Sequence, residues 1–400
     1  MLNESVIKIV KSTAPILAER GEEITKCFYK RLFEDYPQLL NVFNHTNQKT
    51  GEQPRSLATA VYAAAVNIDK LENITAAVVQ IAHKHRSVGV QKEHYPIVGE
   101  YLLKAIKEVL GDAATDEILQ AWEQAYGVIA KAFIDVENTM YEEAEKGEGW
   151  KGFAPFKVVR KEQESELVTS FYLEKEDGKS LPAFLPGQYI SIEAHIPNEE
   201  YTHVRQYSVS SIPNKQYLRL SVKKEGKVSC YLHEDVQVGD LLQISVPAGE
   251  FFLQEHHGEP LVFLGGGVGV TPLMSMLETL VDQKYSGNMT FVQSSCNRNL
   301  HPFYDHVQEL MDKRSFKAYN FYSKPTEACG EHYFNGRINE EWINHNLIQP
   351  NAHYYVCGPK GFMEQVVGAL YKNGVPADCI HYEFFGPKLM LDVEQEQAVL

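Results

Sequence analysis

Two histidines in the segment IAHKHRS could bind a haem iron, and helical geometry distinguishes between them. Ile74, Val78 and Ile81 recur at spacings of four and three residues, which is typical of the apolar face of a helix. His85 continues this face four residues after Ile81, whereas His83 points roughly the opposite way at about 100° per residue. An imidazole on such a face can coordinate haem iron through Nε2, although a lone histidine there is more often a core residue bonded to a carbonyl. The spacing therefore makes His85, and not His83, the candidate ligand.

A carboxylate on a second helical stripe could hold this histidine. The stripe is apolar and comprises Ile118, Trp122, Ala125, Ile129 and Phe133. Glu137 follows four residues after its last member, and a carboxylate that faces a core is costly unless it is paired. We expect Glu137, together with Tyr95, to bond to the unligated Nδ1 of His85, which would fix the tautomer and strengthen electron donation by the ligand. The alternative is that the helix has already turned Glu137 to solvent.

Three motifs in the middle of the chain could bind a flavin. They are PGQY (186–189), RQYSVSS (205–211) and GKVSCYLH (226–233), the last of which leads into a probable helix near Ser229. An arginine and a helix N-terminus can hold a pyrophosphate by charge and by free N–H groups, and a tyrosine can stack on a flavin or hydrogen-bond to it. Each motif alone could equally be a barrel strand with a surface arginine.

Three further motifs follow strands in the last part of the chain, where ligands are expected. In LVFLGGGVGVTPLMSML, a strand runs into glycines and then into Thr271-Pro272 at a helix start, which brings phosphates against backbone N–H groups. This run is not the G-x-G-x-x-G fingerprint, and glycine runs form simple tight turns in many proteins. YYVCGPKGFM (354–363) and YEFFGP (382–387) also follow strands, and ligands of open parallel sheets bind at the carboxyl ends of strands.

The hydrophobic periodicity changes twice along the chain and predicts three domains. Residues 1–147 are helical in pattern, and a short glycine-containing linker, KGEGW, occupies 146–150. From Phe156 the pattern alternates with period two between Gly and Pro turns, which predicts an antiparallel β-barrel over 150–257. Over 258–400, strands alternate with helices, which predicts an α/β domain with a parallel sheet.

Composition limits the class of protein. The 400 residues have a formal net charge of -15, which argues against a nucleic-acid partner because phosphate binding requires clustered Lys and Arg. The start, MLNESVIKIVKSTAP, is too charged for a signal peptide, and no apolar run is long enough to cross a bilayer. The six cysteines form no C-x-x-C pair, which indicates reduced thiols rather than a disulfide framework or a zinc site. We therefore expect a cytoplasmic multidomain protein without stable membrane insertion.

Together the helical positions resemble the bacterial flavohemoglobins, and the order of the motifs covers nearly the whole chain. The resemblance implies an all-α globin domain, an FAD-binding β-barrel and an α/β NAD-binding domain of the ferredoxin-reductase-like kind. It implies haem b, held by His85 as the proximal ligand, with Tyr95 and Glu137 as its charge-relay partners. For the distal side and the haem surroundings it implies Tyr29 and Gln53 near bound oxygen, Phe43 wedging the haem, Leu57 over the iron, and Lys84 near the junction with the flavin. Pro54 directly follows Gln53 and could alter how that side chain points.

The same resemblance assigns the reductase residues. For FAD it implies Tyr189, Arg205, Gln206, Tyr207, Ser208, Val228, Ser229, Glu383, Phe384, Phe385, Gly386 and Pro387, with Phe385 covering the flavin ring. For the nicotinamide nucleotide it implies Gly266, Gly267, Val268, Gly269, Val270, Thr271, Pro272, Cys357, Gly358 and Pro359. The resemblance favours NADH over NADPH. A 2′-phosphate site would need basic residues near the second strand of the last domain, where SSCNR (294–298) supplies only Arg298. The tail KLMLDVEQEQAVL (388–400) is not explained by these motifs.

The activity that the resemblance implies is nitric oxide dioxygenation, in which NAD(P)H reduces the haem through FAD and bound O₂ oxidises NO to nitrate. Two other classes of function stay open. The first is a reductase of other acceptors, such as hydroperoxides, quinones or pteridines, in which the globin is a bystander. The second is an oxygen carrier or sensor that its reductase keeps ferrous. O₂ and NO are the expected small-molecule partners, and a monomer is compatible with the sequence.

Overall fold

The computed structural model describes residues 2–43, 45–214, 216–326 and 333–385. Contacts between Cα atoms divide the chain into two compact units. The first consists of residues 1–153 with 191–205, and the second of residues 154–190 with 206–400. The predicted domain boundaries at 147, 150, 257 and 258 stay predictions.

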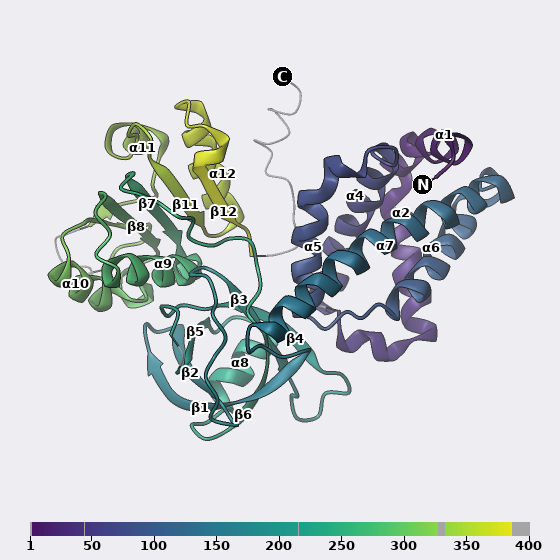
Figure 1. Ribbon diagram of the computed structural model, residues 1–400. Helices are drawn as coiled ribbons and strands as arrows, with labels where there is room; N and C mark the ends of the chain where they lie inside the picture. The colour runs from purple at the N-terminus through teal and green to yellow at the C-terminus, as the bar shows by residue number, and fades with distance from the viewer. Residues whose placement is uncertain (1, 44, 215, 327–332, 386–400) are drawn as a thin grey trace. The chain divides into compact units, whose positions relative to one another are not determined.

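The first part of the chain is helical, as predicted (Figure 1). Its elements are α1 (Glu4–Ser12), α2 (Ala14–Asp35), η1 (Pro37–Asn41), α3 (His45–Lys49), α4 (Glu52–Val66), η2 (Leu71–Ile74), α5 (Thr75–Ser87), α6 (His94–Leu110), η3 (Gly111–Ala113) and α7 (Asp116–Lys146). Side-chain oxygens begin two of these helices, because Asn3 accepts from Val6 N at the start of α1 and Thr115 accepts from Ile118 N at the start of α7. Ile74, which the spacing placed on the helix of His85, belongs instead to the preceding 3₁₀ turn.

The helical core lies where α2 packs against α4 and α6, and α7 packs against α1 and α5. Its buried residues include Ile24, Phe28 and Leu32 of α2, with Trp122 and Ala125 from the predicted stripe of α7. The one polar atom of the Trp122 ring is satisfied there, since Nε1 donates to Thr13 Oγ1 at 3.2 Å. This core holds α5, α6 and α7 in place around His85.

The antiparallel sheet that follows contains β1 (Phe153–Gln163), β2 (Val168–Lys175), β3 (Tyr189–Ala194), β4 (His203–Ser208), β5 (Leu218–Lys223) and β6 (Leu241–Ser245), with α8 (Lys227–Glu234) between the last two. Its strand order is β4-β3-β6-β1-β2-β5, so β4 and β5 are the two edges. A bridge between Val209 and Leu220 joins these edges and closes the sheet as the predicted barrel. The first strand begins at Phe153, three residues before the predicted start at Phe156.

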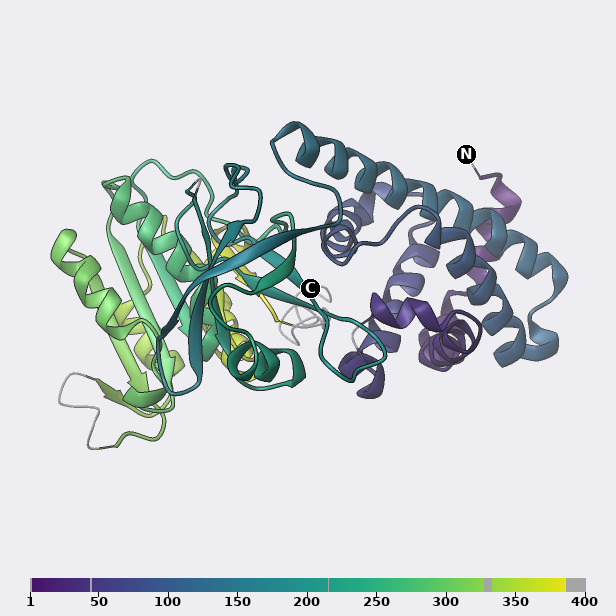
Figure 2. The ribbon, with the colours of Figure 1, turned by 90° about the horizontal axis from the view of Figure 1, so that it is seen from below.

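The last part of the chain is the predicted parallel sheet with covering helices (Figures 1 and 2). Its elements are β7 (Leu261–Gly266), η4 (Gly267–Gly269), α9 (Val270–Asp282), β8 (Met289–Ser295), η5 (Arg298–Leu300), α10 (Tyr304–Lys313), β9 (Lys317–Tyr322), β10 (Phe334–Asn335), α11 (Glu340–Asn346), β11 (His353–Cys357), α12 (Lys360–Lys372), η7 (Ala377–Cys379) and β12 (Ile380–Glu383). The strand order is β10-β9-β8-β7-β11-β12. From β7 the chain adds β8, β9 and β10 on one side and then β11 and β12 on the other, so the strand order switches between β7 and β11. Such a switch point is where open parallel sheets bind ligands.

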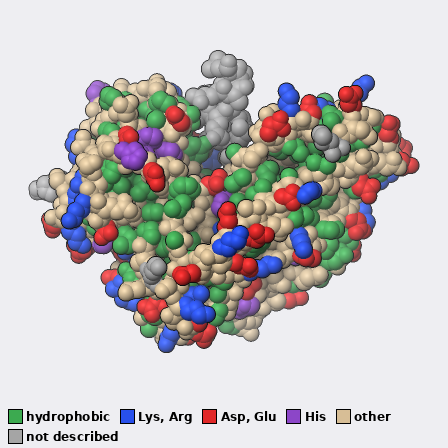
Figure 3. Space-filling model, viewed as in Figure 1, with side chains coloured by type: hydrophobic (Ala, Val, Ile, Leu, Met, Phe, Trp, Pro, Cys, Tyr) green, Lys and Arg blue, Asp and Glu red, His purple; other side chains and the backbone are tan. Residues whose placement is uncertain are grey.

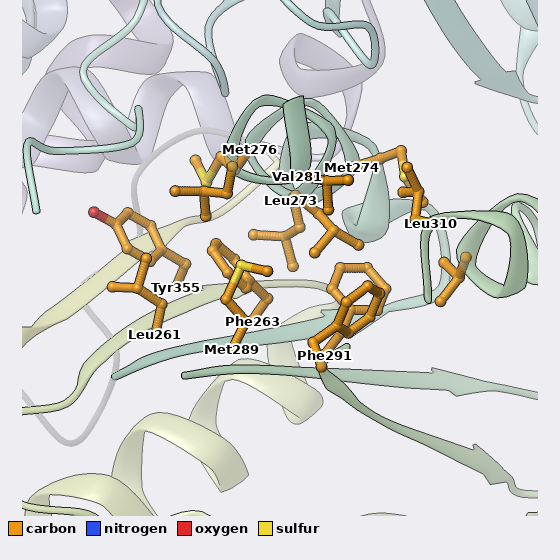
Figure 4. Packing of buried hydrophobic residues seen from close by; sticks show 14 of the residues in the cluster. Leu261, Phe263, Leu273, Met274, Met276, Val281, Met289, Phe291, Leu310 and Tyr355 are labelled. Carbon is orange, nitrogen blue, oxygen red and sulfur yellow. The ribbon is translucent and has the colours of Figure 1, made fainter. Parts of the chain in front are cut away.

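Both faces of this sheet are buried, which explains its continuous apolar strands. Leu261 and Phe263 of β7 pack with α9, and the alternate residues Val262 and Leu264 pack with α12. Figure 4 shows the first of these layers, in which side chains of α9 lie over Phe263, Phe291 and Tyr355. The sheet is therefore a rigid support for the loops at its carboxyl edge.

Charged side chains of both signs lie on the surface of the molecule. On the face shown in Figure 3, acidic and basic side chains are interspersed. Within the residues that the structure covers, no helix is both long and apolar enough to cross a membrane.

Candidate functional site

His85, Tyr95 and Glu137 meet in the helical core and are called the proximal cluster below. His85 Nδ1 lies 2.8 Å from Glu137 Oε1 and 3.1 Å from the Tyr95 hydroxyl. The Tyr95 hydroxyl donates to the same Glu137 oxygen at 2.6 Å. Glu137 is 3% exposed, so α7 turns it into the core and not to solvent.

The hydrogen bonds of the proximal cluster indicate which of its atoms act as donors. Burial and the neighbouring Glu137 carboxylate raise the pKa of Tyr95 far above its usual value, so its hydroxyl stays a donor. The carboxylate accepts the Nδ1–H of His85, which leaves the lone pair on Nε2. His83 lies half-buried two residues away on α5, where burial and Arg86 lower its pKa to about 4.

Tyr126 supports the proximal cluster from behind. Its hydroxyl donates to the Tyr95 carbonyl at 2.7 Å, and its ring lies against Gly99 of α6. A Cβ atom on Gly99 would come within 2.4 Å of the Tyr126 ring, so this close approach requires glycine. Neither residue stood out in the sequence, because a glycine inside a helix carries no signal of what it contacts.

A second polar group surrounds Tyr29 on α2 and is called the distal cluster below. Tyr29 is 6% exposed, and its hydroxyl interacts with the side-chain amides of Gln53 and Gln48. Burial raises its pKa well above the usual value, although both amides act to lower it. Phe43 meets the Tyr29 ring edge-on with centroids 5.5 Å apart, and Phe33 stacks on it at 5.7 Å.

Proline next to Gln53 does not turn that side chain away from Tyr29. Pro54 is the third residue of α4, where its missing N–H costs no helical hydrogen bond. Its carbonyl accepts a buried hydrogen bond of 2.8 Å from Thr25 Oγ1, which ties the start of α4 to α2. Leu57 lies one turn further along α4 and packs on the helical core.

The predicted flavin residues lie around the barrel and α8. Tyr189 begins β3 and exchanges two backbone hydrogen bonds with Ala248, of 2.9 and 2.8 Å. Gly249, at φ 109°, packs against its ring so closely that a Cβ atom would come within 2.8 Å of Cε1. Along β4, Arg205 and Tyr207 are half-buried, Gln206 is exposed and Ser208 is buried.

Both ends of α8 are held by specific bonds. At its start, Ser229 Oγ accepts the N–H groups of Glu225 and Gly226, each at 2.9 Å. At its end, Lys161 Nζ donates to the carbonyls of Leu232, His233 and Val236, at 2.6 to 3.4 Å. These bonds orient the helix, whose first-turn N–H groups lack intrahelical partners and can bind an anion. Val228 and Ser229 are both buried in this first turn.

The predicted nicotinamide residues meet at the carboxyl edge of the parallel sheet. The turn 267–269 after β7 and the loop 357–359 after β11 are called the glycine loops below. A Cβ atom on Gly269 would lie 2.4 Å from the Cys357 carbonyl oxygen and 2.6 Å from Gly358 N, so the two backbones touch. Gly266 precedes the turn, and α9 begins with Val270, Thr271 and Pro272, where Thr271 Oγ1 donates to the Val268 carbonyl at 3.0 Å.

The segment after β12 reaches the same edge. In the sheet register Cys357 pairs with both Gly265 and Glu383, so the carboxyl ends of β7, β11 and β12 are aligned. Phe384 is half-buried and Phe385 is 45% exposed. Gly386, Pro387 and the tail 388–400 lie outside the described residues. Lys84 is on α5, near its end.

The sequence did not point to two further groups. Gln48 joins the distal cluster from α3, a five-residue helix that is too short to show a periodic pattern. Arg219 of β5 forms a buried ion pair with Glu278 of α9 at 2.5 Å, and His306 of α10 contacts the same carboxylate at 2.7 Å. A contact between residues 59 positions apart leaves no local signal.

The residues present fit the expected groups. The proximal cluster leaves Nε2 of His85 as a ligand atom for haem iron, on the side away from its carboxylate partner. Gly249 packs closely on the Tyr189 ring and Gly269 on the Cys357 backbone, so these predicted cofactor residues are held in fixed positions. An oriented helix start at α8 suits a pyrophosphate.

Comparisons with known proteins match three parts of the chain to three domain families. Residues 26–133 match the globin family, residues 155–253 an oxidoreductase FAD-binding domain and residues 263–368 an oxidoreductase NAD-binding domain. Flavohemoproteins of Bacillus subtilis and Bacillus cereus are 49% and 52% identical, over 98% of this chain and 99% and 100% of theirs.

Two solved structures are similar over different lengths. A flavohemoglobin from Malassezia yamatoensis, solved with bound FAD and heme, aligns with a TM-score of 0.86 and 30% identity over 96% of this chain and all of its own. The FAD/NAD-binding domain of a nitric oxide dioxygenase from Vibrio cholerae aligns with a TM-score of 0.55 and 36% identity over 59% of this chain and all of its own.

Proposed function

Because the chain belongs to the flavohemoprotein family, we propose that it is a nitric oxide dioxygenase that uses NAD(P)H to convert NO and O₂ to nitrate. The chain combines a globin domain with FAD-binding and NAD-binding oxidoreductase domains, so it is an oxidoreductase. The observation that carries the proposal is the pairing, within one globin domain, of the proximal cluster with the buried Tyr29 hydroxyl. When bound, NADH supplies a hydride, FAD divides its electron pair, and haem iron accepts single electrons and binds O₂.

On the proximal side, His85 would hold the iron through Nε2. Glu137 accepts the Nδ1–H at 2.8 Å, which gives the imidazole partial anionic character and makes it a stronger electron donor. Tyr95 donates to the same carboxylate oxygen and keeps it in place. An electron-rich ligand favours redox chemistry with oxygen over simple reversible storage, and this supports an enzyme rather than a carrier.

On the distal side, the Tyr29 hydroxyl would donate a hydrogen bond to O₂ at the haem. Its raised pKa keeps the hydroxyl protonated at neutral pH. Phe33 and Phe43 fix the ring through aromatic contacts. Leu57 and Phe43 are apolar residues packed on the same core, so they would exclude water from this side.

In the reductase domains, the first turn of α8 and Arg205 would hold the FAD pyrophosphate, and Tyr189 would contact the flavin. The glycine loops would admit the nicotinamide nucleotide, beside Glu383 and the exposed Phe385. We propose NADH as the donor. Arg298, which could bind a 2′-phosphate, is already paired with Asp305 at 2.9 Å and lies over the Tyr304 ring.

The test is aerobic NO consumption by the purified protein loaded with haem and FAD. We expect consumption that requires NADH, yields nitrate and removes two NO molecules per NADH, because each turnover needs one electron. The Tyr29→Phe variant should release O₂ faster and turn over more slowly. NO consumption that is independent of NADH, or that leaves no nitrate, would overturn the proposal, and a reductase of other acceptors would keep its activity in His85→Ala.

A further inference from the structure

Gln48 carries a buried polar atom that the distal cluster does not satisfy. Its Nε2 atom is inaccessible to solvent and, within the described part of the chain, meets no acceptor in good hydrogen-bond geometry. A buried amide donor without an acceptor has lost its hydration and gained nothing in return, so such groups need an explanation. The Tyr29 hydroxyl lies beside this amide.

The backbone around Gln48 is fixed, so this placement does not reflect a loose side chain on a loose loop. Gly51 follows α3 at φ 79°, a conformation that glycine adopts readily, and its N–H donates to the Gln48 carbonyl at 3.3 Å. Gly51 also begins α4, and the Thr25 bond to Pro54 ties the start of α4 to α2. Gln48 and Gln53 therefore reach Tyr29 from α3 and α4, two helices that a short turn at Gly51 connects.

The bonding capacity of a phenol shows what this arrangement does. A tyrosine hydroxyl has one proton to give and two lone pairs to accept with. The side-chain amides of Gln53 and Gln48 lie beside this hydroxyl, and both act to lower the pKa of Tyr29. Nε2 of Gln48 nevertheless has no acceptor in good hydrogen-bond geometry among the described residues, so both of its N–H groups are available to a further acceptor.

We propose that Gln48 is a third polar residue of the distal pocket, whose side-chain amide donates a hydrogen bond to a diatomic ligand held beside Tyr29, or to the water that precedes it. This inference rests on the proposed function only in assuming that haem binds at His85. It adds a donor from α3 to the two distal residues that the sequence indicated. O₂, which becomes partly negative when bound, would profit from the added donor, whereas CO would profit less.

The experiment measures ligand binding and not turnover. In the haem-loaded, reduced full-length protein, Gln48→Met and Gln48→Glu keep the side-chain length but remove the N–H donor. We expect O₂ to dissociate about 2- to 13-fold faster from both variants, the range expected for one net hydrogen bond. The C–O stretching frequency of the CO complex should rise, because it reports the donors near the ligand. Lys49→Met, an exposed neighbour on the same helix, should match the wild type in both measurements.

Three outcomes separate this inference from its alternatives. If O₂ dissociation in both variants stays within about twofold of wild type and the C–O frequency is unchanged, the inference is wrong. If Lys49→Met changes as much as the Gln48 variants, α3 acts through its backbone and the inference is also wrong. Wild-type NO consumption is measured separately, so loss of the proposed dioxygenase function would leave the comparison of dissociation rates valid.

Discussion

In the proximal cluster three side chains converge on one another, whereas the glycine loops meet where side chains are missing. Glu137 Oε1 receives both a tyrosine hydroxyl and an imidazole, at 2.6 and 2.8 Å. At the sheet edge, Gly269 and Cys357 touch through backbone atoms, and a single added Cβ would overlap the carbonyl. The first region is held together by charge and hydrogen bonds, and the second by the close packing of two backbone segments. Substitutions should therefore act on the two regions through different physical causes and different half-reactions.

The largest effect should come from His85→Ala, which removes the iron ligand. We expect NADH-dependent NO consumption to fall by more than about 100-fold, beyond the loss typical of residues that merely support a metal ligand. Reduction of ferricyanide by NADH, which needs only the reductase domains, should be retained. If ferricyanide reduction falls equally, the two regions do not act independently and the comparison fails.

The complementary substitution is Gly269→Ala at the glycine loops. The new Cβ would lie 2.4 Å from the Cys357 carbonyl oxygen, so the loops must move apart. A misplacement of about 1 Å can cost roughly 100-fold in rate, and we expect ferricyanide reduction by NADH to fall by about that factor. The O₂ dissociation rate should not change. Gly361→Ala is the matched control, because a Cβ there would have open space and the helix would favour alanine.

A smaller effect is expected for Glu137→Gln, which keeps the shape of the proximal cluster and removes its charge. NO turnover should fall by about 10- to 100-fold, as is usual when the partner of a metal-binding histidine is changed. Tyr95→Phe removes only one of the two donors to the carboxylate and should cost less. Unchanged turnover in Glu137→Gln would show that geometry, rather than charge, is what the cluster provides.

The smallest effect contrasts two histidines that both contact a tyrosine. His301 Nδ1 lies 2.8 Å from the Tyr322 hydroxyl but, unlike His85, is almost fully buried, and burial and Arg298 lower its pKa to about 3. An unfolded histidine titrates near 6.5, so protonation favours the unfolded chain, and stability present above pH 6.5 is lost as the pH falls toward 3. His301→Gln should lose about 2 kcal/mol less than wild type between pH 6.5 and 4.5. Denaturant unfolding at several pH values measures this, and parallel curves for both proteins would contradict it.

The sequence predicted those parts of the molecule in which periodic patterns determine the structure. The helical, antiparallel and parallel regions follow from periods of 3.6 and 2, and helical phase selected His85 over His83 and turned Glu137 inward. The ends of elements were predicted less well. Ile74 lies in a 3₁₀ segment and not on the helix of His85, and β1 begins at Phe153, three residues earlier than expected.

Residues whose role depends on distant contacts were not predictable. Gln48 lies on a short helix, and Arg219 and Glu278 pair across the barrel and the parallel sheet. Lys161 binds three carbonyls at the end of α8 from a strand some 70 residues earlier in the chain. In each case the role of a polar residue depends on a partner that is distant in the sequence, so residue spacing does not reveal it. Close glycine contacts such as that of Gly99 with Tyr126 were not predictable either, because the sequence does not show which residue packs against a glycine.

The two hydrogen bonds of Glu137 should limit the local opening of the helices that they connect. One carboxylate oxygen, Oε1, joins His85 on α5 and Tyr95 on α6 to α7. Local opening of α5 must break the charged bond to Glu137 and so costs more than the fraying of an ordinary helix end. Amide hydrogen exchange in the last turn of α5 should accordingly slow to the pace of the start of α6, and both should quicken together when the carboxylate is replaced.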